Sequence, residues 1–154
     1  MKLSSAGNKL IITNEGEKST MYLDSRGIPT IGIGHLILQP SENYLLTATL
    51  TQDQIENLFI KDIARVETWI NQNCIWNPSI KQCEFDALCS FLHQYNIDKY
   101  PNTKAAIING DRTEIINAIL QFRNIVAGSG DNELLPRRQR EIAMFKGIYP
   151  SSIN

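Results

Sequence analysis

Apolar residues recur at helical spacing along most of the chain, and the longest such pattern lies between residues 51 and 72. Isoleucine, leucine, phenylalanine and valine return there every three or four positions, with Asp62 as the one polar interruption of the apolar face. This period predicts a long amphipathic helix over 51–72. Thr51, followed three residues later by a glutamine, is typical of a capping box at its start, and Pro78 lies beyond its expected end.

Shorter helices are predicted on both sides of this long helix. The sequence favours a helix over 3–14, which Gly16 would end. The same periodicity predicts four further helices, at about 78–95, 102–109, 111–123 and 134–146. Between the last two, residues 127–131 contain two glycines and a serine, and we expect a flexible loop there.

Residues 20–38 have a different pattern, because β-branched and aromatic residues replace the helical period. Isoleucine, threonine and tyrosine favour strands, and the run Ser25-Arg26-Gly27 together with Gly32 and Gly34 supplies turns. We therefore predict a small antiparallel sheet. The segment 39–50 that follows is rich in serine, asparagine and threonine, and it is expected to be a loop.

Together these elements predict a mostly helical α+β fold that forms a single domain over residues 1–154. Its parts would be a small β-containing lobe at about 14–50, a connecting helix at about 51–72 and a helical lobe at about 74–154. The first helix can pack on either lobe. Two lobes joined by a helix leave a cleft between them, and clefts are where substrates bind.

Composition and charge are ordinary for a globular protein. The chain has 154 residues, 42% of them hydrophobic and 20% charged, which is enough for one domain with its own core. A formal net charge of −1 argues against a nucleic-acid binder that neutralises many phosphates, although a local basic patch remains compatible with it. No apolar run approaches the roughly 20 residues of a membrane span. Polar residues from Ser4 to Lys9 interrupt the N-terminal stretch, so neither membrane insertion nor a signal peptide is expected.

The three cysteines, Cys74, Cys83 and Cys89, are too few for a disulfide framework. Their spacings, in a chain with only two histidines, do not suit a metal site either. We expect free thiols that act as small apolar side chains, with one disulfide as the alternative after export.

Acids, a hydroxyl and glycines are concentrated between residues 15 and 35. Glu15 lies at a predicted helix end, Asp24 on the first strand of a predicted hairpin, and Thr30 near the start of the next strand. The negative end of a helix dipole favours the protonated carboxyl that a general acid requires, whereas Asp24 on an open hairpin would stay ionised. Two carboxyls in different environments suit glycoside hydrolysis. The structural alternative is that Glu15 is a surface acid and Asp24 a turn residue.

Residues 15–35 resemble the active-site signature of the phage-type lysozymes, glycoside hydrolase family 24. That signature is Glu-Gly, Tyr-x-Asp, Gly and Thr-Ile-Gly-x-Gly-His, and it matches here without a gap. Segments 85–90 and 134–141 are similar to the helical lobe of the same family. The resemblance implies a lysozyme-like fold and hydrolysis, with inversion, of the β-1,4 bond between N-acetylmuramic acid and N-acetylglucosamine in peptidoglycan. Glu15 would be the general acid, and Asp24 with Thr30 would position the water, with no cofactor or metal.

The resemblance also implies roles for residues around the cleft. The residues expected to contact the glycan are Gln94, Thr103 and Arg138, and Arg138 is also expected to lie near Glu15. The residues expected to shape the site are Gly32, Gly34 and His35. The alternative for Arg138 is a solvated basic helix face shared with Arg137 and Arg140. For His35 a structural role, packing the small lobe, is the preferred reading. His93, Trp69 and Trp76 are likewise expected to pack inside the protein.

Three departures from the family pattern leave the biological setting open. They are the run His93-Gln94-Tyr95-Asn96, the segment 97–103 and Phe122, so either the glycan subsites differ or an inhibitor or partner has shaped this side. The chain is expected to be a monomer that acts on peptidoglycan strands in the periplasm. It would reach them as a phage or prophage endolysin through a holin, or as a secreted antibacterial effector with a cognate immunity protein. A peptidoglycan binder of lysozyme fold without activity and a lytic transglycosylase are the alternatives.

Overall fold

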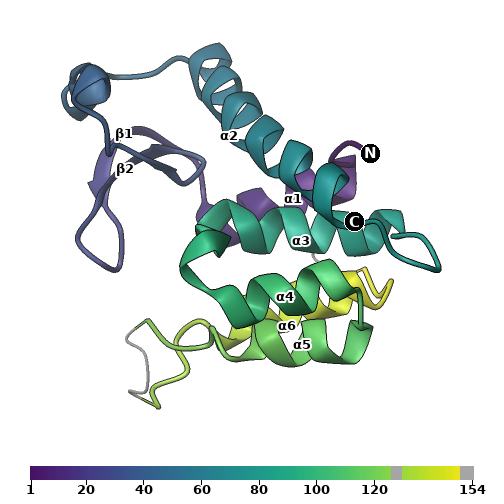
Figure 1. Cartoon of the computed structure of the whole chain (residues 1–154). Helices are drawn as coiled ribbons and strands as arrows, with labels where there is room; N and C mark the ends of the chain where they lie inside the picture. Colours follow the sequence, from purple (N-terminus) through teal and green to yellow (C-terminus); the bar gives the residue numbers. More distant parts are fainter. Residues whose placement is uncertain (126–129, 150–154) are drawn as a thin grey trace.

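The computed structural model describes residues 1–125 and 130–149 (Figure 1). Six α-helices lie in the described part of the chain: α1 (Ser5–Glu15), α2 (Gln52–Asn73), α3 (Gln82–Gln94), α4 (Pro101–Asn109), α5 (Arg112–Leu120) and α6 (Leu135–Phe145). Three strands, β1 (Lys18–Leu23), β2 (Pro29–Gly32) and β3 (His35–Leu36), and two 3-10 helices, η1 (Pro40–Leu46) and η2 (Ile97–Lys99), complete the fold. It is the mostly helical α+β fold with a small antiparallel sheet that the sequence predicts.

The predicted elements are found with small shifts at their ends. The segment expected to be a loop over 39–50 contains η1, and the helix expected from 78 begins at Gln82. It begins there because the Glu84 side chain accepts a hydrogen bond from the Lys81 backbone amide at 2.8 Å, which satisfies a donor at the helix start. Of the expected flexible loop over 127–131, residues 127–129 lie outside the described part of the chain.

Side-chain caps fix where the other helices begin. The Thr51 hydroxyl accepts from the Gln54 amide at 3.3 Å, and the Gln54 side chain accepts from the Thr51 amide at 2.8 Å, which is the predicted capping box of α2. Asp111 caps α5 by accepting from the amides of Thr113 and Glu114.

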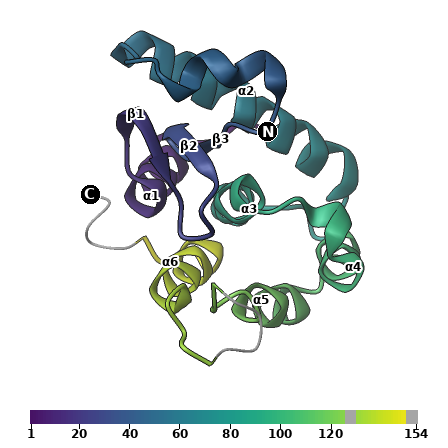
Figure 2. The ribbon, with the colours of Figure 1, turned by 90° about the vertical axis from the view of Figure 1, so that its left-hand side faces the viewer.

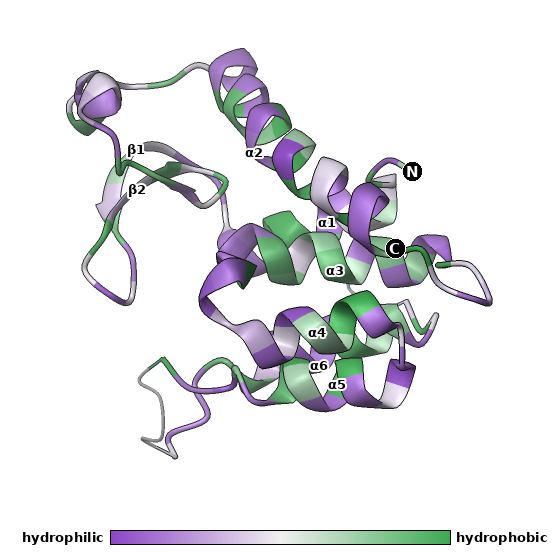
Figure 3. Cartoon of the chain, viewed as in Figure 1, coloured by the Kyte–Doolittle hydropathy of each residue, from purple (hydrophilic) through white to green (hydrophobic). Residues whose placement is uncertain are grey.

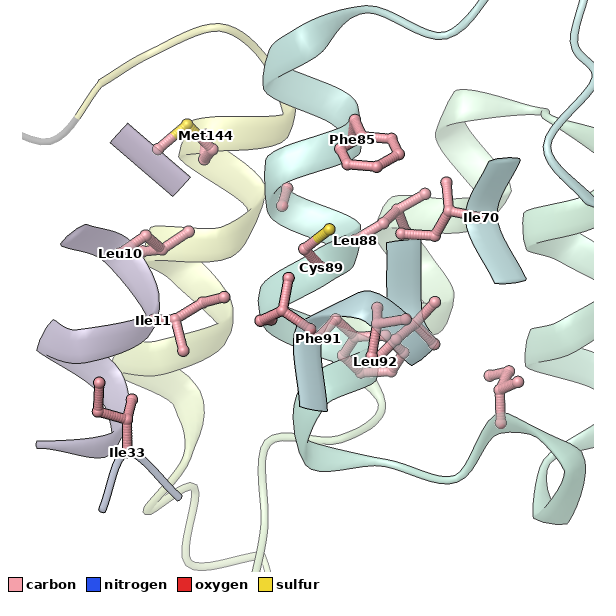
Figure 4. Packing of buried hydrophobic residues seen from close by; sticks show 14 of the residues in the cluster. Leu10, Ile11, Ile33, Ile70, Phe85, Leu88, Cys89, Phe91, Leu92 and Met144 are labelled. Carbon is pink, nitrogen blue, oxygen red and sulfur yellow. The ribbon is translucent and has the colours of Figure 1, made fainter. Parts of the chain in front are cut away.

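The helical part of the molecule is built around α3. Figure 2 shows α3 in the middle of the other helices, and Figure 3 shows apolar residues along most of it, as a helix surrounded by others requires. In the close view of Figure 4, side chains of α1 and α6 pack on one side of α3 and Ile70 of α2 packs on the other. Phe85, Leu88 and Phe91 of α3 are fully buried. The first helix therefore packs on the helical part, which resolves the choice that the sequence left open.

The sheet is antiparallel, in the order β1-β2-β3, with Tyr22 opposite Thr30 and Ile31 opposite His35. In Figure 1, α2 runs from the side of the sheet to the side of the helices. Asp62, the one polar residue on the apolar face of α2, has a partner in the sheet. Its Oδ2 lies 2.9 Å from Nδ1 of His35. Nε2 of His35 lies 3.4 Å from Oε1 of Glu42. His35 thus joins the sheet to both α2 and η1, which is the structural role that the sequence favoured.

The two tryptophans and the three cysteines are buried or partly buried, as expected. Trp76 is buried and donates from Nε1 to the carbonyl of Ile107 at 2.9 Å, and Trp69 is partly buried against the core. Cys74 and Cys89 are buried free thiols, and burial raises the pKa of the Cys74 thiol to about 12. Within the described ranges, no helix is both long and apolar enough to cross a membrane.

Candidate active site

Glu15 is the last residue of α1, and the end of that helix places it in a cavity. Gly16 terminates the helix with φ +71°, and its amide donates to the carbonyl of Ile12 at 2.8 Å. The cavity has a volume of about 260 Å³ and is called here the catalytic cavity. Its lining includes all three predicted catalytic residues and four neighbours that the next paragraphs describe: Glu15, Asp24, Thr30, Tyr22, Arg26, His93 and Arg137.

Two contacts fix the carboxyl group of Glu15. Nη2 of Arg137 donates to Oε1 of Glu15 at 2.6 Å, in a contact that joins positions 122 residues apart. On the other side the backbone of Gly34 approaches so closely that a Cβ there would lie 2.9 Å from Cδ and Oε2 of Glu15. Gly34 also has φ +70°, a conformation that glycine adopts easily. The predicted site-shaping role of Gly34 therefore has a physical basis, since a side chain at this position would displace the Glu15 carboxyl.

Asp24 lies where β1 turns toward β2, and it accepts four hydrogen bonds. Oδ1 accepts from the backbone amides of Arg26 and Ile28, both at 2.8 Å. Oδ2 accepts from the guanidinium of Arg26, at 3.1 Å from Nε and 2.9 Å from Nη2. Partial burial raises the pKa of Asp24, but the bonds from Ile28 and Arg26 to the charged form outweigh it, so the pKa is lowered overall. Asp24 is therefore an ionised carboxylate at neutral pH, as the hairpin position suggested.

Thr30 is buried on β2 and lines the same cavity. Its hydroxyl donates to the carbonyl of Ile28 at 2.9 Å. A hydroxyl that donates in this way keeps its lone pairs as acceptors for a water molecule. Tyr22 lies opposite Thr30 in the sheet, and burial together with Glu15 and Asp24 raises the pKa of its phenol. The spacing of Tyr22 and Asp24, two residues apart at a strand end, is the sequence signal that places both on one side.

The ion-pair partner of Glu15 is Arg137 and not Arg138, so the sequence interpretation was wrong on this point. Arg138 is fully buried and donates to Oε1 of Gln94 at 2.7 Å. Consecutive residues of a helix point about 100° apart, and on α6 that rotation turns Arg137 toward Glu15 and Arg138 toward α3. Both guanidinium groups pair with Glu141. The alternative of a solvated basic face is also wrong for both residues, since Arg137 is only 6% exposed.

A second cavity of about 430 Å³ adjoins the first and is called here the aromatic cavity. Both other predicted glycan contacts, Gln94 and Thr103, line it, although Thr103 is only 6% exposed. The aromatic residues that depart from the family pattern also meet here, with the ring centroids of Tyr95 and Phe122 4.6 Å apart. Tyr100 packs on Phe122 at 4.8 Å. The two cavities share four lining residues: Ser25, Arg26, Gln94 and Leu134.

His93 has a structural contact at the edge of the catalytic cavity. Its Nε2 lies 2.9 Å from the carbonyl oxygen of Ile33, which ties α3 to the loop after β2. Across the part of the chain that the structure describes, no group of three or more metal-ligating side chains was found. The chemistry available here is that of two carboxyls, two guanidinium groups, a phenol, an imidazole and two hydroxyls.

Comparison with known proteins places this geometry in context. The model of the phage lysozyme family matches residues 13–141. The endolysin of Salmonella phage P22 is 32% identical over 149 residues, which cover 94% of this chain and 98% of that protein. A crystal structure of a P22 lysozyme mutant has a TM-score of 0.73 at 30% identity, and the match covers 95% of this chain and 99% of that chain.

A second solved structure agrees on the fold. The endolysin from Escherichia coli O157:H7 phage FAHEc1 has a TM-score of 0.74 at 24% identity, over 98% of each chain. The family match includes the span from Glu15 to Thr30 and most of α6, so the residues around the catalytic cavity fall within it.

Proposed function

Because this chain belongs to the phage lysozyme family of glycoside hydrolases, we propose that it hydrolyses the β-1,4 bond between N-acetylmuramic acid and N-acetylglucosamine in peptidoglycan. The observation that carries the proposal is the meeting of Glu15, Asp24 and Thr30 on one cavity. They come from a helix end, a turn and a strand, so three separate elements bring them to one cavity. Retention of all three favours an enzyme over a peptidoglycan binder, which needs no general acid.

Glu15 is the general acid in this proposal. Arg137 holds Oε1, so the carboxyl is oriented and Oε2 is the oxygen that carries and delivers the proton. The proton goes to the glycosidic oxygen as its bond to the anomeric carbon breaks, and the leaving sugar departs as an alcohol. Gly34 keeps this carboxyl in place because its backbone packs directly against it.

Asp24 and Thr30 act on the water that attacks the anomeric carbon from the opposite side of the sugar. The Thr30 hydroxyl accepts a hydrogen bond from this water and so positions it, and Asp24 accepts the proton that the water loses. One proton enters the leaving group and one leaves the water, so Glu15 ends the turnover ionised and Asp24 protonated, and proton exchange with solvent restores both. The product is a free reducing muramic acid with inverted configuration.

The test is product analysis of purified peptidoglycan. The wild-type chain is expected to release reducing muramic acid ends, and Glu15→Gln is expected to lower the rate by about 10²–10⁴-fold through loss of the acid. Glu17→Gln is the matched control, since it makes the same change on an exposed side chain two residues away. Anhydromuramyl ends would mean a lytic transglycosylase. A wild-type rate equal to that of Glu15→Gln would leave only a binder.

We also propose that the activity serves bacterial lysis, because the P22 relative is an endolysin and the match covers 98% of its length. The peptidoglycan of a Gram-negative host lies in the periplasm, and a holin is the proposed route by which the chain reaches it from the cytoplasm. Expression with a holin is expected to lyse the host, and expression of Glu15→Gln with the same holin is not. Lysis by Glu15→Gln at the wild-type rate would contradict the role.

A further inference from the structure

The hydrogen bonds of Asp24 use every acceptor site that its carboxylate has. A carboxylate has two oxygens and about four lone-pair positions. Two backbone amides occupy Oδ1, and Nε and Nη2 of Arg26 occupy Oδ2, all within 3.1 Å. In this arrangement Asp24 has no lone pair left to accept a proton from water. The structure therefore describes a resting state of the base.

Of the four donors, only the Arg26 guanidinium can leave without unfolding the turn. The two amides are part of the backbone of the hairpin, whereas the guanidinium is at the end of a flexible side chain that is 40% exposed. A partly exposed ion pair contributes little stability, so the Arg26 guanidinium can exchange the Asp24 carboxylate for another carboxylate with little change in free energy. The base becomes available when Arg26 moves to a different acceptor.

The aromatic cavity offers the place for such an acceptor. Arg26 lines both cavities, so it lies at their junction. The described residues that line the aromatic cavity include a second cation, Lys99, and no aspartate or glutamate. Tyr95 and Tyr100 add apolar rings beside these charges. A cavity with this lining suits an anion attached to an apolar or amide-rich chain.

We propose that Arg26 holds Asp24 in a resting state, and that a carboxylate of the peptide stem of peptidoglycan, bound in the aromatic cavity, takes over the guanidinium and frees the base. This inference rests on the proposed muramidase function, since the stem is attached to the muramic acid whose bond is cleaved. Arg26 acts through Asp24 and is a positioning residue. It would make hydrolysis faster on glycan that still carries its stems.

The experiment compares intact peptidoglycan strands with the same strands after an amidase has removed the stems. The wild-type chain is expected to show a higher kcat on intact strands. Arg26→Gln is expected to raise kcat on stripped strands by about fivefold, the effect of losing one partly exposed ion pair. The kcat values on intact and stripped strands should then be nearly equal. The kcat of Arg26→Lys on stripped strands should lie between those of the wild type and Arg26→Gln, because an ammonium cannot occupy both lone pairs of Oδ2 as the guanidinium does. Arg65→Gln, the same change on an exposed position of α2, is the control.

The pH profile separates this role from a structural one. Arg26→Gln is expected to move the acid limb of kcat/KM to higher pH on stripped strands, because Arg26 helps to lower the pKa of Asp24. The other groups around the catalytic cavity, namely Glu15, Tyr22, His93 and Arg137, are unchanged in this variant. An acid limb that does not move, or an equal loss of kcat on both substrates, would overturn the proposal.

A binding measurement tests the exchange without any turnover, so it remains informative if the muramidase function fails. The NMR signal of Arg26 Nε–H is followed while a soluble stem peptide with free carboxylates is added. We expect the signal to shift, and we expect no shift with the same peptide after amidation of its carboxylates. No response to either peptide, or the same response to both, would refute the exchange. Absence of muramic acid ends from both wild-type digests would refute the proposed function instead.

Discussion

Replacing Gly34 with alanine tests the claim that a bare backbone positions the catalytic acid. The new Cβ would lie 2.9 Å from Cδ and Oε2 of Glu15, whereas ordinary van der Waals contact begins at 3.4 Å. Restoring ordinary contact therefore requires the carboxyl or the loop to move by about 0.5 Å. Gly34 also has φ +70°, which costs a residue with a side chain about 1–2 kcal/mol.

We expect Gly34→Ala to lower the free energy of unfolding by about 1–2 kcal/mol and to lower kcat on the order of 100-fold. The large effect on rate has a geometric cause, since the proton of Glu15 must reach one particular oxygen of the substrate. Unfolding in urea measures the first quantity. The rate of release of reducing ends per folded molecule measures the second.

Two other glycines serve as controls. Gly130 has φ +78° with nothing within 4 Å of an added Cβ, so Gly130→Ala introduces backbone strain alone. Gly110 has φ +77° and a Cβ there would lie 2.6 Å from the Trp76 ring, so Gly110→Ala combines strain and close contact in the scaffold. Both variants should lose stability and keep most of their activity. If Gly34→Ala kept more than about a third of the wild-type rate, or lost no more than Gly110→Ala, the reasoning would be refuted.

Three further predictions concern the core and its ion pairs. Arg137→Lys should lower the free energy of unfolding by about 1.5–3 kcal/mol, because one ammonium cannot reach all the acceptors of the guanidinium; wild-type stability in urea would contradict this. The hydrogen bond to Asp62 raises the pKa of His35 above 6.5 despite burial, so its stabilisation is complete below pH 6.5 and is lost as the pH rises through the raised pKa. Thermal unfolding should therefore show a steeper loss of stability above that pH for the wild type than for His35→Gln, and equal slopes would refute it. Phe85→Ala, which empties a fully buried position of α3, should cost about 3–5 kcal/mol in urea unfolding, and a loss below about 1 kcal/mol would contradict the packing.

The secondary structure was largely predictable because its causes are local. The capping box that begins at Thr51, and the 3.6-residue period after it, predicted α2 to within a residue at each end. The misplaced start of α3 had a local cause as well, since the Glu84 side chain caps the helix there. The segment over 39–50 gave no strong signal, and η1 was missed because 3-10 turns depend little on side-chain period.

Within the site, Glu15, Asp24 and Thr30 could be predicted as candidate catalytic residues because all three lie on one short stretch of the chain. Their meeting at one cavity follows from a helix end and a hairpin, which neighbouring residues determine. Asp62 was visible only as an interruption of an apolar face. Its reason, the hydrogen bond to His35, required α2 to pack against the sheet.

The sequence by itself determined the order of the elements, the family and the position of the candidate acid and base, since each depends on residues close together in the chain. Only the tertiary structure decided that Arg137 rather than Arg138 faces Glu15, because the packing of α6 against α1 and α3 selects which of two adjacent side chains points to the cavity. The tertiary structure also placed Arg26 between two cavities, one of them lined mainly by residues from 94–103 and 121–125. Contacts between distant segments depend on how whole surfaces fit together, and no local pattern contains that information.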